Sequence, residues 1–222
     1  MEAPLSFQFS PYQLVLWCLG AFLCGSIPFG LIVVKLLGKG DVRSKGSGNI
    51  GATNVSRVAG KSVGVLVLLL DVGKGFGPVF LAKRFGFPGE ALSLLALSAV
   101  AGHMFTPWLR FKGGKGVAAA LGAALAFNWI LVIPAFLLFL CVVVITRFVS
   151  LASILGALTL PLLIWNHAWR GRDAVPYHTA TSAIWLAISL LVIAKHHENI
   201  RRLLNGTESR LWTSKPKEGF ND

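Results

Sequence analysis

The chain has 222 residues, of which 55% are apolar and only 14% are charged, and its formal net charge is +12. Soluble globular proteins usually contain about 25% charged residues, so this composition excludes an ordinary soluble domain and indicates an integral membrane protein. The positive charge is then explained by cytoplasmic loops that face anionic lipid, and nucleic acid is not expected as a partner. The three cysteines lie within apolar runs and lack the spacing of a metal site, so no metal ligands are expected.

Apolar runs along the chain predict about seven transmembrane helices in a single domain, residues 1–222, with a charged tail from about residue 195. The expected spans are 13–37, 62–81, 90–104, 116–127, 129–145, 151–165 and 179–194. The first is interrupted near Pro28, and the fourth is rich in small residues and is expected to be a half-span or a tightly packed helix. We therefore predict an all-α polytopic membrane protein in which some helices are short or broken.

The distribution of basic residues predicts how these helices are oriented. Sixteen of the 21 Lys and Arg residues fall in loops or in the tail on one side of the expected bundle. Four fall on the other side, and Lys74 lies within a span. Because basic loops remain in the cytoplasm, we expect the N-terminus outside and the C-terminus inside. The Gly-rich polar loops then share the cytoplasmic face.

The polar segment between the first two spans has the composition of a phosphate site. It reads GSGNIGATNVSRVAGK, residues 46–61. Its small residues let an anion approach the backbone N–H groups closely, and its hydroxyl, amide and cationic side chains can add direct contacts.

Two further polar segments are expected on the same face. They read HMFTPWLRFKGGKG (residues 103–116) and KHHENIRRLLNGTE (residues 195–208). Neither GSGNIG nor FKGGKG fits the GxxxxGK[ST] pattern of a P-loop. Taken singly, their basic residues could be topology signals and their glycines could serve turns or helix packing. Those interpretations leave the repeated Asn, Ser and Thr residues unexplained.

The ordered motifs SGNIGATNVSRVAGK, FKGGKG and HHENIRRLLNGTE resemble those of a bacterial membrane glycerol-3-phosphate acyltransferase, the PlsY family. The resemblance covers nearly the whole chain. It implies a compact seven-helix enzyme that transfers a fatty acyl group from acyl phosphate to the 1-hydroxyl of sn-glycerol 3-phosphate. The products would be lysophosphatidic acid and phosphate, in the first membrane step of bacterial phospholipid synthesis.

The same resemblance implies a multi-pass location in the bacterial cytoplasmic (inner) membrane, among membrane lipids. No metal or coenzyme A is implied as a cofactor. A soluble enzyme that produces acyl phosphate is a candidate partner.

The resemblance also assigns site residues by position. Substrate-binding groups are expected at Ser47, Asn49, Thr53, Asn54, Arg57, Gly113, Gly114 and Asn199, and catalytic groups at Lys115, Ser153 and His196. One departure concerns His103, because family members often have Pro three residues after this His. Here Thr106 takes that place and Pro107 follows, so the role of His103 stays open.

Elementary chemistry agrees with these assignments. Both implied substrates carry a phosphate, so two cation-rich pockets must meet at the membrane surface. Arg57 suits bidentate phosphate binding, and Lys115 suits a point charge beside the departing phosphate. Attack on the acyl carbonyl creates an oxyanion, which N–H groups of a Gly-rich loop could stabilise.

The group that accepts the hydroxyl proton is left open by the sequence. No His is followed by Asp five positions later, so the HxxxxD dyad of acyltransferases that use coenzyme A or a carrier protein is absent. His196 is one candidate base. A phosphate oxygen of a substrate is the other, and it is the one we favour.

Asp71 and Lys74 are an ionisable pair within a predicted span, spaced i,i+3 on a helix. Such a pair is a functional candidate by default, but a structural role that locks helices together is favoured here. A small transporter for an anionic metabolite would explain this pair and the broken helices. It would not explain three polar motifs on one face, and an inactive membrane scaffold would not need them.

Overall fold

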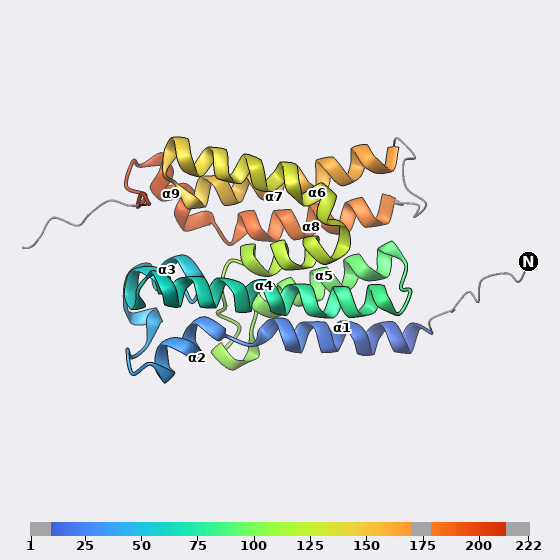
Figure 1. Cartoon of the computed structure of the whole chain (residues 1–222), viewed down its shortest axis with the longest axis horizontal. Coiled ribbons are helices and arrows are strands. Elements are labelled where there is room, and N and C mark those ends of the chain that lie inside the picture. The colour runs from blue at the N-terminus through green and yellow to red at the C-terminus, as the bar shows by residue number, and fades with distance from the viewer. Residues whose placement is uncertain (1–9, 170–178, 212–222) are drawn as a thin grey trace, which may run out of the picture.

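The computed structural model describes residues 10–169 and 179–211, and all regular elements in these ranges are helical (Figure 1). The α-helices are α1 (Pro11–Ser26), α2 (Phe29–Leu36), α3 (Ala52–Ala59), α4 (Lys61–Arg84), α5 (Gly89–Met104), α6 (Val117–Thr146), α7 (Val149–Trp169), α8 (Thr179–Ala194) and α9 (His197–Leu204). Two 3-10 turns, η1 (Val42–Ser44) and η2 (Pro107–Leu109), lie in the loops. The prediction of an all-α fold is confirmed.

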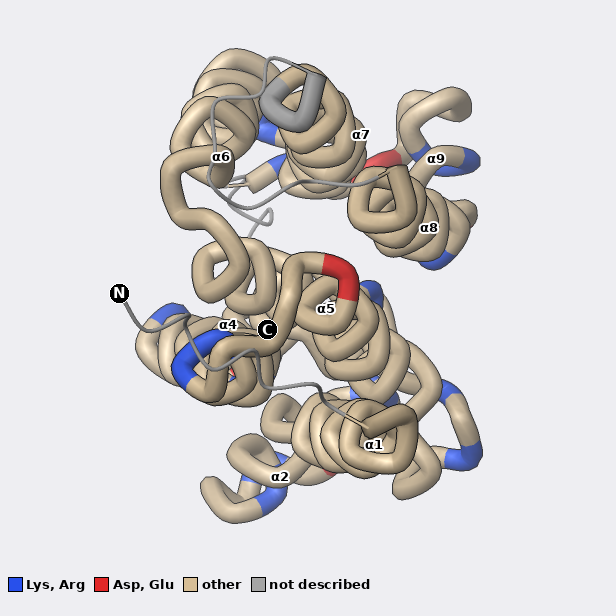
Figure 2. The backbone as a smooth tube through the Cα atoms, turned by 90° about the vertical axis from the view of Figure 1, so that its right-hand side faces the viewer, with Lys and Arg blue, Asp and Glu red and all other residues tan. Residues whose placement is uncertain are grey.

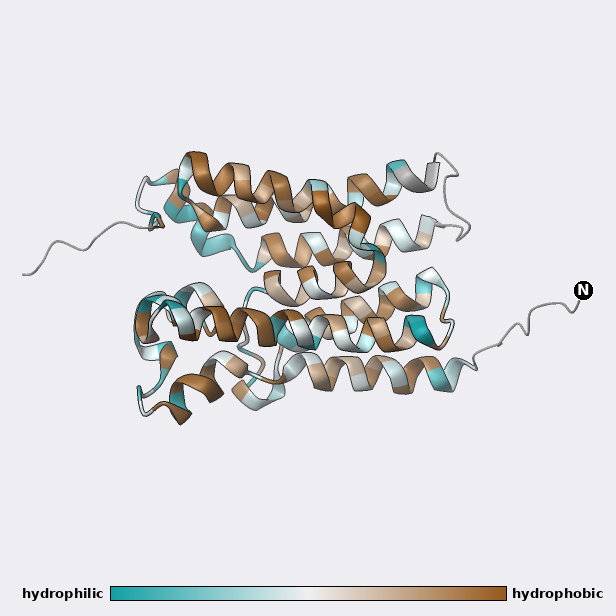
Figure 3. Cartoon of the chain, in the orientation of Figure 1, coloured by the Kyte–Doolittle hydropathy of each residue, from teal (hydrophilic) through white to brown (hydrophobic). Residues whose placement is uncertain are grey.

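The long helices run along one axis and form two groups. Figure 2 looks along that axis and shows α1, α4 and α5 on one side and α7 and α8 on the other. Hydrophilic residues gather mainly at the end of the bundle that carries α3 and α9 (Figure 3). Large apolar side chains face outward on the helices, such as Val144 (70% exposed) and Leu162 (69% exposed). This outer surface suits lipid, and the fold is that of an integral membrane protein.

Five segments of the described chain are long and apolar enough to cross a membrane. A sixth results if α8 and α9, which meet at 57°, count together. The predicted boundaries agree well with these helices, and the 179–194 span coincides with α8. The number of seven crossings and the orientation of the termini stay predictions.

The break between α1 and α2 occurs at Pro28, as expected from the sequence. Proline lacks an N–H group, so nearby carbonyl groups lose their helical partners and need others inside a membrane. Thr106 Oγ1 donates to the carbonyl of Ser26 at 2.7 Å. Lys74 Nζ donates to the carbonyl of Ile27, also at 2.7 Å. The break is therefore satisfied by side chains from α4 and from the segment after α5.

Helix α6 consists of two arms that meet at Asn128, whose backbone is not helical (φ −155°, ψ 97°). The first arm packs on α4 and the second on α7, so α6 links the two groups of helices (Figure 2). Asn128 Oδ1 accepts the N–H of Ile130 at 3.1 Å, as a cap does at the start of a helix. Lys83 Nζ donates to the carbonyls of Ala126 and Phe127 at the end of the first arm. The kink at Asn128 agrees with the two separate spans, 116–127 and 129–145, that the sequence predicts.

Two short helices differ from the sequence-based expectations. The first polar segment, residues 46–61, was expected to be a loop. Residues 52–59 of it form α3, which buries Val55 and Ala59 one turn apart. The charged tail contains α9, whose buried residue is Asn199. Both helices are amphipathic but only eight residues long and at least half polar, and both are held by contacts with other helices of the chain.

Close helix packing at α4 depends on glycine. A Cβ atom added to Gly75 would lie 2.0 Å from the carbonyl oxygen of Ala119 on α6. A Cβ added to Gly122 of α6 would lie 1.9 Å from the carbonyl oxygen of Val72. The two backbones thus touch directly, which is how small residues act in membrane helix pairs.

This contact predicts a position-specific loss of stability. We expect Gly75→Ala to lower the unfolding temperature in detergent, because the new methyl group forces α4 and the first arm of α6 apart at a cost of about 1–3 kcal/mol. Gly73→Ala is the matched control on the same helix, since no atom lies within 4 Å of its added Cβ. Equal unfolding temperatures for the two variants would contradict the predicted contact.

Candidate active site

The first polar segment is organised around the side chain of Asn54, which is only 2% exposed. Its Oδ1 accepts the backbone N–H of Ser47 at 2.8 Å. Its Nδ2 lies 2.8–3.1 Å from the carbonyl oxygens of Val42, Lys45 and Asn49. Every polar atom of this amide is therefore used within the protein. Asn54 therefore holds the segment in shape through its backbone partners, and its role in substrate binding stays a prediction.

The other residues expected in this segment lie closer to its surface. Ser47 and Arg57 are exposed, whereas Asn49 and Thr53 are partly buried. Asn49 Oδ1 accepts the N–H of Gly51 at 2.8 Å, which fixes the turn into α3. Among the described residues, the Arg57 guanidinium has no hydrogen bond or ion pair. A free guanidinium beside a fixed turn is available to an anionic ligand.

The glycines of the second segment pack against the end of α5. The N–H of Gly113 donates to the carbonyl of Met104, and the N–H of Gly114 donates to that of His103, both at 3.1 Å. A Cβ added to either glycine would lie 2.1 Å from an atom of His103. Since both N–H groups are engaged inside the protein, they are not free to stabilise a substrate oxyanion in this structure.

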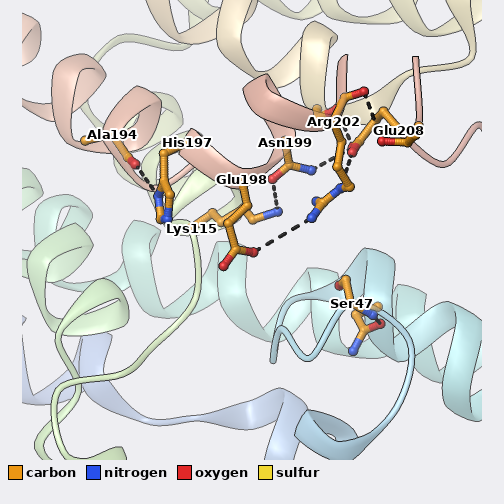
Figure 4. A network of polar contacts seen from close by, with 11 residues as sticks. Ser47, Lys115, Ala194, His197, Glu198, Asn199, Arg202 and Glu208 are labelled. Carbon is orange, nitrogen blue, oxygen red and sulfur yellow. Dashed lines mark hydrogen bonds and ion pairs between the residues drawn. The ribbon is translucent and has the colours of Figure 1, made fainter. Parts of the chain in front are cut away.

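Lys115 follows these glycines and connects the second segment with the third (Figure 4). Its Nζ donates to Asn199 Oδ1 at 2.5 Å. Asn199 Nδ2 donates in turn to Glu208 Oε1 at 2.6 Å. The carboxylate therefore fixes which way the amide points, and the amide oxygen then holds the ammonium group.

Glu208 is the centre of this network. Its Oε1 also accepts from Ser150 Oγ of α7 at 2.7 Å, and its Oε2 accepts from Arg202 Nε at 2.7 Å. Burial alone would raise the pKa of Glu208, but the hydrogen bonds from Ser150, Asn199 and Arg202 outweigh it and lower the pKa below its ordinary value. The carboxylate stays charged and joins α7, α9 and Lys115.

Charged groups of the first and third segments influence Lys115. Burial lowers the pKa of Lys115, and the nearby cations Arg202 and Arg57 lower it further. The carboxylates of Glu208 and Glu198 act in the opposite direction. Arg57 belongs to the first segment and Arg202 to the third. Cations from the first and third segments thus both act on Lys115 of the second.

His196 lies between α8 and α9 and is 3% exposed. Its Nδ1 is 2.7 Å from the carbonyl oxygen of Val192. A carbonyl oxygen only accepts, so Nδ1 carries the proton and Nε2 keeps a lone pair. Burial, with a smaller effect from Lys115, lowers the pKa of His196 to about 4. The imidazole is therefore neutral near pH 7.

Ser153 is buried on α7, and its Oγ donates to the carbonyl of Val149 at 2.8 Å. Ser150, one turn earlier, makes the direct contact with Glu208. Ser150, Arg202 and Glu208 were not among the residues selected from the sequence. Glu208 could have been selected from the sequence, because it is a carboxylate in the same motif as His196 and Asn199.

The buried pair Asp71 and Lys74 lies outside this network. Lys74 Nζ is 2.8 Å from Asp71 Oδ1 and also holds the carbonyl of Ile27 at the α1–α2 break. These contacts support the structural role favoured from the sequence. Within residues 10–169 and 179–211, no group of three or more His, Cys, Asp or Glu side chains is placed to hold a metal ion.

Residues 15–206 match the sequence model of the glycerol-3-phosphate acyltransferase family. The chain belongs to this family. The glycerol-3-phosphate acyltransferase of Syntrophotalea carbinolica is 46% identical over 193 residues, which cover 86% of this chain and 94% of the relative. That of Geobacter sulfurreducens is 44% identical over 190 residues, which cover 86% of this chain and 93% of the relative.

Two crystal structures of PlsY (YgiH), an integral membrane glycerol 3-phosphate acyltransferase, have the same fold. The glycerol 3-phosphate form matches with a TM-score of 0.81 and the lysophosphatidic acid form with 0.79. Each is 41% identical to this chain and covers 89% of it and 95% of the PlsY chain. The family resemblance inferred from the three motifs is confirmed, and this glycerol-3-phosphate acyltransferase is a multi-pass membrane protein.

The network around Glu208 predicts a loss of substrate affinity in the acyltransferase. We expect Glu208→Gln to raise KM for a phosphate substrate about 10–100-fold, because Arg202 loses its charged partner and Asn199 is free to turn away from Lys115. Glu198→Gln is the control. Glu198 lies 3.8 Å from Arg202 and its side chain is 66% exposed, so steady-state kinetics should change less than about twofold.

The lowered pKa of His196 predicts how stability depends on pH. Between about pH 4 and pH 6.5 the unfolded chain binds a proton at this residue that the folded protein does not. The contribution of His196 to stability therefore decreases as pH falls through this window. His196→Gln should flatten the dependence of unfolding temperature on pH. The exposed His197→Gln variant should retain the wild-type slope, and equal slopes in all three proteins would contradict the prediction.

Proposed function

We propose that this protein transfers a fatty acyl group from acyl phosphate to the 1-hydroxyl of sn-glycerol 3-phosphate. The products are 1-acyl-glycerol 3-phosphate (lysophosphatidic acid) and inorganic phosphate. The hydroxyl oxygen forms a bond to the acyl carbon, the bond from that carbon to the phosphate oxygen breaks, and the hydroxyl proton is taken up by an oxygen of a phosphate group. The setting is the bacterial cytoplasmic membrane.

The observation that carries this proposal is the cluster formed by Arg57, Lys115 and Arg202. Arg202 and Arg57 both lower the pKa of Lys115, a repulsion that a bound anion would relieve. Glu208 neutralises part of the cluster and Arg57 remains unpaired among the described residues. A reaction with two phosphate-bearing substrates uses such a cluster fully, because each substrate brings negative charge.

The cations have different tasks in this reaction. Arg57 is exposed, and its planar guanidinium suits the phosphate that must be held throughout, that of glycerol 3-phosphate. Lys115 is held by Asn199 and sits at the start of α6, where it suits the phosphate that departs. Ser47, Asn49 and Thr53 add polar contacts around the first phosphate.

The acyl oxyanion requires N–H donors other than those of Gly113 and Gly114. Gly116 precedes α6 and supplies no side-chain cap, so the first N–H groups of the helix lack intrahelical partners. They follow Lys115 directly in the chain. We assign the oxyanion to this helix start, beside the leaving phosphate.

The proton of the attacking hydroxyl goes to phosphate on energetic grounds. A phosphate monoester has a second pKa of about 6, whereas the pKa of His196 is lowered to about 4. Burial therefore leaves the imidazole a weaker base than a phosphate monoester in water. His196 Nε2 still has a lone pair and can accept a hydrogen bond that orients the hydroxyl.

The proposed donor fits this chemistry better than a thioester does. Acyl phosphate brings its own good leaving group and a charge that the cluster recognises. The HxxxxD motif of thioester-dependent acyltransferases is absent. A soluble enzyme that produces acyl phosphate remains the proposed partner, and neither a metal nor coenzyme A is part of the proposed mechanism.

The test uses purified protein in detergent with glycerol 3-phosphate and either acyl phosphate or acyl coenzyme A. We expect lysophosphatidic acid and phosphate to form in equal amounts from acyl phosphate, and acyl coenzyme A to support about 100-fold less turnover. Lys115→Met should lower kcat/KM about 100-fold, the usual loss for one group that stabilises developing charge.

Two outcomes would oppose the proposal. Equal turnover with acyl coenzyme A would show that the donor is wrong. Uptake of glycerol 3-phosphate into proteoliposomes, without lysophosphatidic acid in either assay, would favour the transporter alternative.

A further inference from the structure

We propose that His103 is a positioning residue whose imidazole supports Gly114 and thereby sets the place of Lys115, while Asp71 and Lys74 fix the imidazole from α4. The inference rests on the proposed function, because Lys115 is the group whose placement matters for phosphate. It also assigns a task to the one motif residue that the sequence left open.

The contact between His103 and Gly114 is the first observation. His103 lies in the last turn of α5 and is 3% exposed. Its carbonyl accepts the N–H of Gly114 at 3.1 Å. Its Nε2 lies only 2.1 Å from the position that a Cβ of Gly114 would occupy. Backbone and side chain of His103 therefore both contact the residue that precedes Lys115.

The second observation is the contact of His103 with α4. His103 Nδ1 faces Asp71 Oδ1 at 3.7 Å and has no hydrogen-bond partner among the described residues. Asp71 Oδ1 is also 2.8 Å from Lys74 Nζ, as an ion pair. A polar atom buried without a partner is uncommon in proteins. An imidazole shift of less than about 1 Å toward α4 would join Nδ1 to Asp71.

The third observation links this cluster to the first polar segment. Lys74 Nζ donates to the carbonyl of Ile27 at the α1–α2 break, and α2 leads into that segment. On the opposite side of the α5 end, Lys195 Nζ donates to the carbonyl of Met104 at 3.1 Å. The α5 end is thus held from α4 on one side and from the α8–α9 junction on the other. Placement of Lys115 depends on both.

A double-mutant cycle tests the contact directly. Gly114→Ala should lower kcat/KM about 30-fold, because the new methyl group meets the imidazole. In the His103→Ala background the same change should cost less than about threefold, since the space is then free. Gly113→Ala is the matched control. Its Cβ would lie 2.1 Å from the backbone carbonyl of His103, which the His103→Ala variant keeps, so its loss should be equal in both backgrounds.

A second readout separates positioning from a merely structural role. Lys115→Met should raise KM for acyl phosphate, the substrate whose phosphate is assigned to Lys115. His103→Ala should raise the same KM. Thr106→Val also removes a buried polar group from this region, the donor to the Ser26 carbonyl. It should lower the unfolding temperature and leave KM and kcat unchanged. If His103→Ala does not fold, His103→Asn replaces it in the cycle, because Asn is too short to reach Gly114.

The binding of inorganic phosphate, the leaving group assigned to Lys115, provides a readout that needs no acyl donor. The increase in unfolding temperature that inorganic phosphate causes should be smaller in Gly114→Ala than in the wild type, whereas Gly114→Ala should change it little in the His103→Ala background. This measurement keeps the inference testable if acyl phosphate proves to be the wrong donor. Equal effects of Gly114→Ala in both backgrounds, or wild-type kinetics for His103→Ala, would overturn the inference.

Discussion

The fold depends on hydrogen-bond partners for the backbone groups that lose their helical partners where a membrane helix is broken. No water is available in the hydrocarbon core, so each freed carbonyl needs a partner from the protein. Lys74 and Thr106 serve the break between α1 and α2, and Lys83 serves the end of the first arm of α6. These breaks allow α6 to begin part-way along the bundle (Figure 1). The loop that carries Lys115 therefore lies between the helices.

Charge in the site is arranged by the same rule that governs the breaks: a buried polar group needs a partner. Glu208 takes hydrogen bonds from three side chains and leaves Asn199 with its oxygen toward Lys115. Asn54 plays a similar part in the first segment, where its amide ties Ser47 to the turn before α3. Two buried side chains thus hold two sets of polar groups in place. Hydrogen-bonded buried side chains fix the geometry of the site, and its cations supply positive charge. This combination suits the binding of phosphates in a fixed mutual position.

Much of the fold could be predicted from the sequence, because apolar runs, Pro28 and the polar Asn128 have local meaning in a membrane. The three motifs were also recognised, since their glycines, cations and amides lie close together in the chain. What could not be predicted depends on distant partners. Glu208 contacts Ser150, which is 58 positions away, and the tasks of Asn54, Gly113 and Gly114 follow from what each one packs against. The family resemblance assigned them as substrate-binding groups, whereas burial shows that they also shape the site.

The relation between His196 and phosphate explains why the proposed reaction needs little acid–base machinery from the protein. Burial weakens the imidazole as a base, and the same burial keeps it neutral, so it adds no repulsion to a site that already contains three cations. A charged His196 would compete with Lys115 for Glu208 and Asn199. A neutral imidazole with its lone pair on Nε2 can hold the hydroxyl while a phosphate oxygen takes the proton. The protein then contributes chiefly by binding two anions close together, and the cations that bind them also stabilise the leaving phosphate.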